Sequence, residues 1–135
     1  MLRSAIFSVV LVVVASPASA QIGSPEILIF GGYNRDEFLG CYSCGDYDSD
    51  SVWNRYSTHG WSNRYGTWSR YGPHKSRYSS TSACSPYASS PPVLVDRRGN
   101  YYGELSVSRT RADSVCGANG ARRVCTALLV MCGDG

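Results

Sequence analysis

Residues 45–90 contain a single branched aliphatic residue, Val52, and this scarcity constrains the fold more than any other feature of the sequence. The other aliphatic residues after residue 21 gather mainly at 26–30, 92–107 and 124–132. A chain of this length forms one domain. Because so little apolar material is available, its core must be thin, and a small secreted domain of this kind usually contains disulfide bonds.

Residues 1–20 have the pattern of a secretory signal peptide. One cation, Arg3, precedes an apolar run over 5–15, and small residues follow at 18–20. The run is shorter than the roughly 18 residues that a membrane-spanning helix needs. We therefore expect export, to the periplasm or the exterior, of a single domain over 21–135 that has no membrane span.

The charge of the exported chain argues against nucleic acid as a partner. Without Arg3 the chain has twelve Lys and Arg against ten Asp and Glu, which is a net charge of +2. This charge is too small to attract a phosphate backbone. We expect neither DNA nor RNA binding.

Six cysteines follow the predicted signal peptide, and in an oxidising compartment an even number predicts structural disulfides. They are Cys41, Cys44, Cys84, Cys116, Cys125 and Cys132. Sequence alone leaves fifteen pairings open. A two-residue turn at 119–120 would place Cys116 and Cys125 diagonally, roughly 7 Å apart, so a bond between them needs a longer or bulged loop.

The hydrophobic pattern predicts strands at both ends of the chain. The run at 27–30 is broken by a Gly pair, and apolar character resumes at 38–41. Residues 91–108 indicate two strands joined by a turn at 96–100. We interpret 122–132 as a last strand, with a short buried helix as the alternative. On that strand Cys125 and Cys132 would point to opposite faces, so at least one should reach back toward Cys41, Cys44 or Cys84.

The middle segment, 45–90, is repetitive. The phrase YDSDSVWNRY at 47–56 returns as YSSTSACSPY at 78–87, with a shortened copy, YGTWSRY, at 65–71. The alignment places Trp53, Trp68 and Cys84 in one slot at intervals of 15 and 16 residues. Short repeats of this kind stack as supersecondary units. We predict that each copy forms one or two helical turns with a Ser or Asp cap.

The same segment holds all three Trp, six of the ten Tyr, both His and twelve Ser. Because aliphatic residues are lacking, we expect the Trp and Tyr rings to form the core here; a binding surface is the alternative. Cys84 would then form a disulfide between this segment and another part of the chain, with Cys41 or Cys44 or with a C-terminal cysteine. The fold class predicted is α+β, or mainly β: a short sheet packed on a Trp/Tyr-rich segment of short helical turns and loops.

Three motifs occur in a fixed order: FLGCYSC at 38–44, the repeats beginning with DSDSVWNRY at 48–56, and PPVLVDRRGNYYG at 91–103. In this order they resemble a family of uncharacterised bacterial proteins that have an FLGCxxC segment, tandem DSDSxWNxYG phrases and a PPVxVDxxGNxYG hairpin. The resemblance covers 28–110 and implies membership without a mechanism. The degraded middle repeat, Cys84 in the Trp slot and the cysteine-rich tail depart from the family pattern, and they suggest a version locked by extra disulfides.

Three chemical activities are weakly supported by the residues. Cys41 and Cys44 have the CxxC spacing of thiol oxidoreductases, but the acidic, Gly-containing stretch that follows does not favour the helix such a thiolate needs. Zinc binding by these cysteines with His59 and His74 would need the two His closer together. A Ser–His–Asp hydrolase lacks its GxSxG motif. We expect no catalytic residues, no cofactor and no metal.

Binding is the better-supported role. Aromatic side chains interleaved with Ser, Asn and Arg combine rigid apolar area with adaptable polar contacts. The candidate binding residues are Trp53, Arg55, Tyr56, Trp61, Arg64, Tyr65, Trp68, Arg70 and Tyr71. The sequence thus favours a non-catalytic exported module that binds cell-wall glycan or a protein partner. The alternatives are a periplasmic thiol-active or metal-binding protein using Cys41 and Cys44, and a small secreted hydrolase inhibitor.

Overall fold

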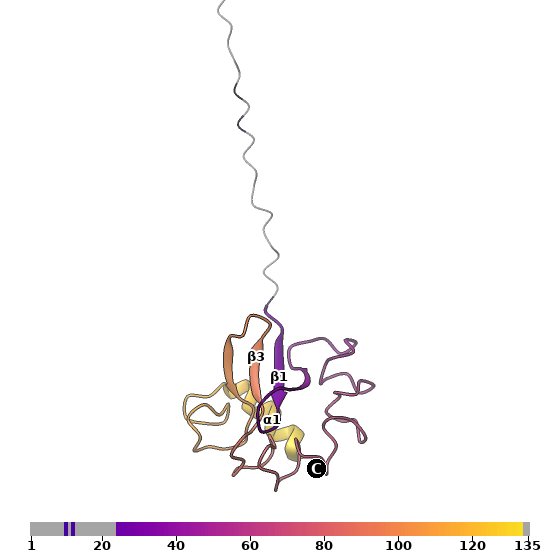
Figure 1. Ribbon diagram of the computed structural model, residues 1–135, viewed down its shortest axis with the longest axis vertical. Helices are drawn as coiled ribbons and strands as arrows, with labels where there is room; N and C mark the ends of the chain where they lie inside the picture. Colours follow the sequence, from indigo (N-terminus) through magenta and orange to yellow (C-terminus); the bar gives the residue numbers. More distant parts are fainter. Residues whose placement is uncertain (1–9, 11, 13–23, 134–135) are drawn as a thin grey trace, which may run out of the picture.

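Four strands and one helix are the regular elements of the computed structural model, which describes residues 10, 12 and 24–133 (Figure 1). The predicted signal peptide lies outside the described residues except at these two isolated positions. The elements are β1 (Ile27–Gly31), β2 (Glu37–Cys41), β3 (Val93–Asp96), β4 (Tyr101–Glu104) and α1 (Arg122–Gly133). A small domain with a sheet, a helix and disulfides matches the predicted α+β class.

The strands form one antiparallel sheet in the order β2-β1-β3-β4. The central pair, β1 and β3, brings the two aliphatic runs together, with Ile29 opposite Leu94. The predicted strand over 101–108 is shorter than expected. The Leu105 N–H still bonds the carbonyl of Pro92, the residue opposite it, and the backbone then leaves the sheet, because the Val107 N–H bonds the Ala83 carbonyl.

The C-terminal segment is a helix, so the preferred interpretation of 122–132 as a strand was wrong and the alternative of a short helix is confirmed. Leu128 and Met131, one helical turn apart, are its buried residues. Arg, Ala, Leu and Met also favour helix over strand. The expected two-residue hairpin at 119–120 is absent as well: the Gly120 N–H closes a turn on the Gly117 carbonyl, and the chain then enters α1.

Residues 45–90, all of which the structure describes, contain turns and no helix, so the predicted helical turns do not form. Backbone N–H groups bond carbonyls three residues earlier, at Ser51, Asn54, Ser57 and Gly60 in succession. Side-chain oxygens of Ser51, Asn54 and Ser57 also accept the N–H two residues further on. Such side chains compete with helix formation and stabilise turns.

Three successive turns of three residues each form what we call a coil, and backbone hydrogen bonds between residues nine apart join one coil to the next. The Trp61 N–H bonds the Val52 carbonyl at 2.8 Å, and the Thr67 N–H bonds the Thr58 carbonyl at 2.9 Å. The structural repeat is therefore nine residues long, and the proposed equivalence of Trp53, Trp68 and Cys84, at intervals of 15 and 16 residues, is wrong. Its members differ in environment: Trp53 is 37% exposed, whereas Trp68 is fully buried.

Three layers contribute to one core. Ile29, Leu39 and Leu94 come from the sheet, Trp61 and Trp68 from residues 45–90, here called the turn segment, and Leu128 and Met131 from the helix.

Three disulfides, Cys41–Cys44, Cys84–Cys132 and Cys116–Cys125, account for all six cysteines. Cys132 does reach back to Cys84, and this bond joins the end of the turn segment to the helix. The Cys116–Cys125 bond spans the turn that replaces the expected hairpin.

The two hairpins lead into the same backbone arrangement. The Cys41 N–H bonds the Asp50 carbonyl at 2.7 Å, and the Glu104 N–H bonds the Asp113 carbonyl at 2.8 Å. Each acceptor begins an Asp-Ser-Val sequence, at 50–52 and 113–115. The residue before each donor is a glycine with positive φ, Gly40 at 123° and Gly103 at 117°.

Candidate binding groove

A partly open groove of about 630 Å³ lies between the turn segment and the helix. A volume of this size is in the range of small-molecule and oligosaccharide sites. Its lining residues are Val52, Trp53, Trp61, Ser62, Asn63, Arg64, Trp68, Arg70, Tyr71, Lys75 and Met131. The groove therefore combines aromatic rings, cations and amide or hydroxyl groups on one surface.

Two stacked tryptophans form the base of the groove. The rings of Trp61 and Trp68 are 4.2 Å apart with an interplanar angle of 28°. Trp68 is fully buried, and its indole N–H donates to the Leu39 carbonyl at 2.9 Å. This bond fixes the pair against β2, so the aromatic base is rigid.

Trp61 differs from the other two tryptophans in its hydrogen bonding. The indole N–H of Trp53 donates to the Tyr42 carbonyl, as that of Trp68 does to Leu39. The Nε1 atom of Trp61 is buried and has no acceptor among the described residues. A buried donor without a partner costs about 1–3 kcal/mol. Trp61 is thus the tryptophan of the groove whose polar group the fold leaves unsatisfied.

Cations stand beside these rings. The Lys75 ammonium lies 5.4 Å from the centre of the Trp61 ring and 3.5 Å from the Trp61 carbonyl oxygen. The Arg70 guanidinium lies 5.6 Å from the centre of the Tyr71 ring. Cations over aromatic faces gain about 0.5–1 kcal/mol at exposed sites. The charges are therefore held close to the aromatic base.

The turns explain why Arg and Tyr point outward. The turns that open on Asn54, Asn63 and Ser69 continue with Arg and then Tyr. The two central residues of each turn are exposed, and Tyr56, Tyr65 and Tyr71 are exposed by 87%, 91% and 90%. Large aromatic side chains exposed to this extent commonly mark interaction surfaces.

The groove brings together most of the candidate binding residues. Trp53, Trp61, Arg64, Trp68, Arg70 and Tyr71 line it, whereas Arg55, Tyr56 and Tyr65 lie outside its lining. Trp61 and Trp68 belong to the core as expected, but the prediction that the Tyr rings form it too was wrong, because all six tyrosines of 45–90 are exposed. Sequence reasoning missed Met131, because it lies on the helix that was predicted as a strand.

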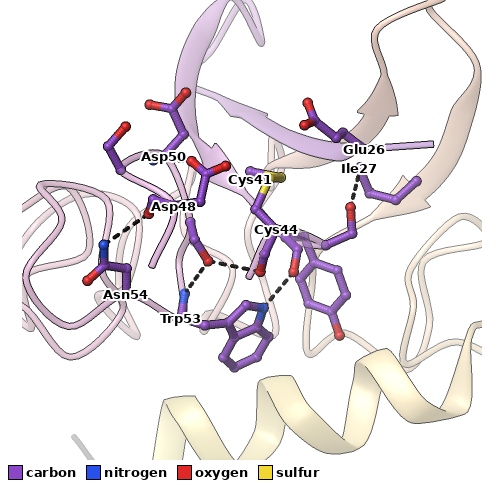
Figure 2. The surroundings of a disulfide bond; sticks show 12 residues. Glu26, Ile27, Cys41, Cys44, Asp48, Asp50, Trp53 and Asn54 are labelled. Atoms are coloured by element: carbon purple, nitrogen blue, oxygen red, sulfur yellow. Dashed lines mark hydrogen bonds between the residues drawn. A yellow bond between two sulfur atoms is a disulfide. The ribbon is translucent and has the colours of Figure 1, made fainter. Parts of the chain in front are cut away.

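The CxxC motif is a disulfide at the edge of the sheet (Figure 2). Cys41 is 1% exposed, and the Cys44 carbonyl accepts the Ser51 hydroxyl. Turns follow Cys44, so the helix N-terminus that stabilises a catalytic thiolate is not found in this described stretch. Glu26 and Asp48 approach the Cys44 sulfur, but that sulfur is bonded and Glu26 pairs with Arg97 at 2.6 Å.

The two histidines have separate environments. His59 Nδ1 is 3.0 Å from the Thr67 hydroxyl, and His74 Nε2 is 3.3 Å from a Glu37 carboxylate oxygen. The cysteines that would complete a zinc site are bonded to each other. The four residues considered from the sequence therefore do not form one set of metal ligands.

Two groups that do not line the groove have shifted pKa values. Burial raises the pKa of Tyr42, whose ring packs edge-on against Trp53 with centres 5.6 Å apart. A hydrogen bond from the Asn100 side chain lowers the pKa of Asp96 to about 2, and this carboxylate caps the turn of the second hairpin.

Comparisons with protein-family models, curated proteins and solved structures found no significant match. Within the described residues no helix has the length and apolar character to cross a membrane. Three disulfides are consistent with an oxidising compartment.

Proposed function

We propose that the protein is a non-catalytic exported module that binds a cell-wall or extracellular glycan in the groove beside Trp61 and Tyr71. The supporting observation is the groove itself, where a rigid Trp pair meets exposed Tyr and amide groups. The C–H groups of a sugar ring carry partial positive charge, and the faces of aromatic rings are negative. The Ser62 hydroxyl offers a partner for sugar hydroxyls, whereas the Asn63 side chain is bonded within its own turn, to the Ser57 carbonyl and the Tyr65 N–H.

A glycan suits the groove better than a folded protein partner does. A stable protein interface needs about 800 Å² on each side, which is much more than the surface of one groove of this size. A saccharide segment fits inside such a volume and needs only a few placed polar groups. The thiol-active alternative gains no comparable support, because Cys41 is 1% exposed and bonded to Cys44.

Two tyrosines provide a matched test of this proposal. Tyr71 lines the groove and Tyr56 does not, although both follow Arg in an exposed turn. The protein exported to the periplasm should be titrated with immobilised and soluble glycans, and binding measured by calorimetry. We expect Tyr71→Ser to weaken binding about tenfold, because stacking is worth about 1–3 kcal/mol per ring, and Tyr56→Ser to change it less than twofold. Equal losses, or no glycan bound, would refute the proposal.

A further inference from the structure

The charges around the groove indicate which glycans it accepts. Arg64, Arg70 and Lys75 line it, and no Asp or Glu is among its described lining residues. The acidic residues that precede the groove, at 46, 48 and 50, lie outside that lining. The groove is therefore cationic although the chain as a whole is nearly neutral.

The arginines of the groove take no part in the ion pairs of the fold. Among the described residues, the salt bridges join Glu104 to Arg35 and Arg111, Glu26 to Arg97, and Glu37 to His74. Arg64 and Arg70 occur in none of them. Both are exposed, so their guanidinium groups can reach a ligand without breaking an ion pair of the fold; Arg70 also lies 5.6 Å from the centre of the Tyr71 ring.

Building on the proposed glycan-binding function, we infer that the groove selects acidic sugar chains whose residues carry carboxylates. Arginine presents parallel N–H donors that match the two oxygens of a carboxylate, and such charge-assisted bonds are about twice as strong as neutral ones. The sugar ring would lie beside Tyr71, which lines the groove and is 90% exposed, while its carboxylate pairs with Arg64 or Arg70.

A pair of repeated arginines makes the inference testable. Arg55 and Arg64 occupy equivalent positions nine residues apart, in the same Asn-Arg-Tyr sequence, and both are exposed. Only Arg64 lines the groove. General attraction between cations and a polyanion would depend on both residues equally, whereas a site in the groove depends on Arg64.

The experiment compares oligogalacturonides with uncharged galactan oligosaccharides of the same length by calorimetry, at low and at physiological salt. We expect the acidic chains to bind at least about tenfold more tightly and to weaken as salt rises. Arg64→Gln and Arg70→Gln should each weaken acidic binding about tenfold, and Arg55→Gln less than twofold. Circular dichroism and the melting temperature of each variant would establish that it is folded.

The outcomes separate this inference from the proposed function. If neutral and acidic chains bind equally, or if Arg55→Gln weakens binding as much as Arg64→Gln, selection by charge in the groove is overturned while glycan binding stands. If polyglutamate of similar length binds as tightly as the oligogalacturonides, the groove recognises charge without sugar, and the inference is also overturned. If no saccharide binds at all, both proposals fail together.

Discussion

The β1–β2 and β3–β4 hairpins, which are the two halves of the sheet, continue into the same backbone arrangement, yet the segments that follow them differ: turns and an aromatic-lined groove follow the first, whereas a disulfide and the helix follow the second. After Val52 the chain runs on as turns, and Trp53 remains 37% exposed. After Val115 the equivalent residue, Cys116, is bonded to Cys125 in the first part of α1. Met131, near the end of the same helix, lines the groove, so α1 contacts the segments that follow both hairpins.

The comparison also separates the backbone from the side chains that stabilise it. Cys41 in the first half corresponds to Glu104 in the second. Cys41 is locked by its disulfide, whereas the buried Glu104 carboxylate is held by Arg35 at 2.8 Å and Arg111 at 2.9 Å. A disulfide at Cys41 and a cluster of ion pairs at Glu104 thus stabilise equivalent positions after the two hairpins. What the halves share is the glycine, the Asp-Ser-Val segment and the backbone hydrogen bonds.

The largest expected difference lies between the disulfides. Sequence separations of 48, 9 and 3 residues predict losses on Cys-to-Ser replacement of about 4, 2.5 and 1.5 kcal/mol, because longer loops restrict the unfolded chain more. Chemical denaturation of the paired variants at Cys84/Cys132, Cys116/Cys125 and Cys41/Cys44 gives the three values. A larger loss for the Cys41/Cys44 pair than for Cys84/Cys132 would contradict this ranking.

The two glycines should differ less. A Cβ at Gly40 would meet Val52 at 2.8 Å, His59 at 2.9 Å and the Asp50 carbonyl at 3.1 Å; at Gly103 one close contact, with the Asp113 carbonyl at 2.9 Å, adds to the unfavourable φ. We expect Gly40→Ala to cost about 3 kcal/mol and Gly103→Ala about 2 kcal/mol. Gly99→Ala, at a positive φ of 84° in open space, is the control for backbone strain without close contacts. Urea unfolding gives the free energy of unfolding of all three variants. Equal losses for all three would show that the close contacts add nothing to the backbone strain.

Lowering the pH should destabilise the turn of the β3–β4 hairpin more than the turn of the β1–β2 hairpin. The pKa of Asp96 is lowered from 3.8 to about 2, first by the Asn100 side chain and then by backbone N–H groups and the Tyr102 hydroxyl. Because the folded pKa lies below the unfolded one, this stabilisation is present above about pH 4 and is lost as the pH falls through 2. We expect Asp96→Asn to be less stable than wild type at pH 7, with a gap that narrows toward pH 2.

Hydrogen exchange locates that effect. The amides of Arg98 and Asn100, which bond the Asp96 carboxylate, should lose protection in Asp96→Asn, while those of the β1–β2 turn keep theirs. A pH-independent gap between the variant and wild type would show that the carboxylate charge is not what stabilises the turn.

The smallest effect is expected on the outer face of the turn segment. Tyr56 is 87% exposed and forms no hydrogen bond through its hydroxyl within the described part of the chain. Tyr56→Ser should change the free energy of unfolding by less than about 0.5 kcal/mol, whereas Trp68→Phe, which removes the bond to the Leu39 carbonyl, should cost about 1–3 kcal/mol. Thermal unfolding measures both. A large loss for Tyr56→Ser would mean that the outer tyrosines stabilise the coils.

The strands could be predicted from sequence because two aliphatic runs, at 27–30 and 92–95, have no other role in so polar a chain. The coils could not, since the nine-residue period is set by backbone bonds, such as Trp61 to Val52, that the ten-residue alignment does not reveal. The composition of the groove was largely foreseen. Its shape was not, because the Cys84–Cys132 bond and the helix that brings Met131 to the turns depend on a pairing that sequence leaves open.

The stacking of coils by bonds between residues nine apart has a consequence for how such proteins can vary. A coil gained or lost would move the rest of the turn segment by one backbone spacing and leave the inward and outward positions unchanged. The sheet at one end and the Cys84 crosslink at the other would not need to change in sequence. Under the proposed function, the length of glycan that the protein binds would then change in steps with the number of coils.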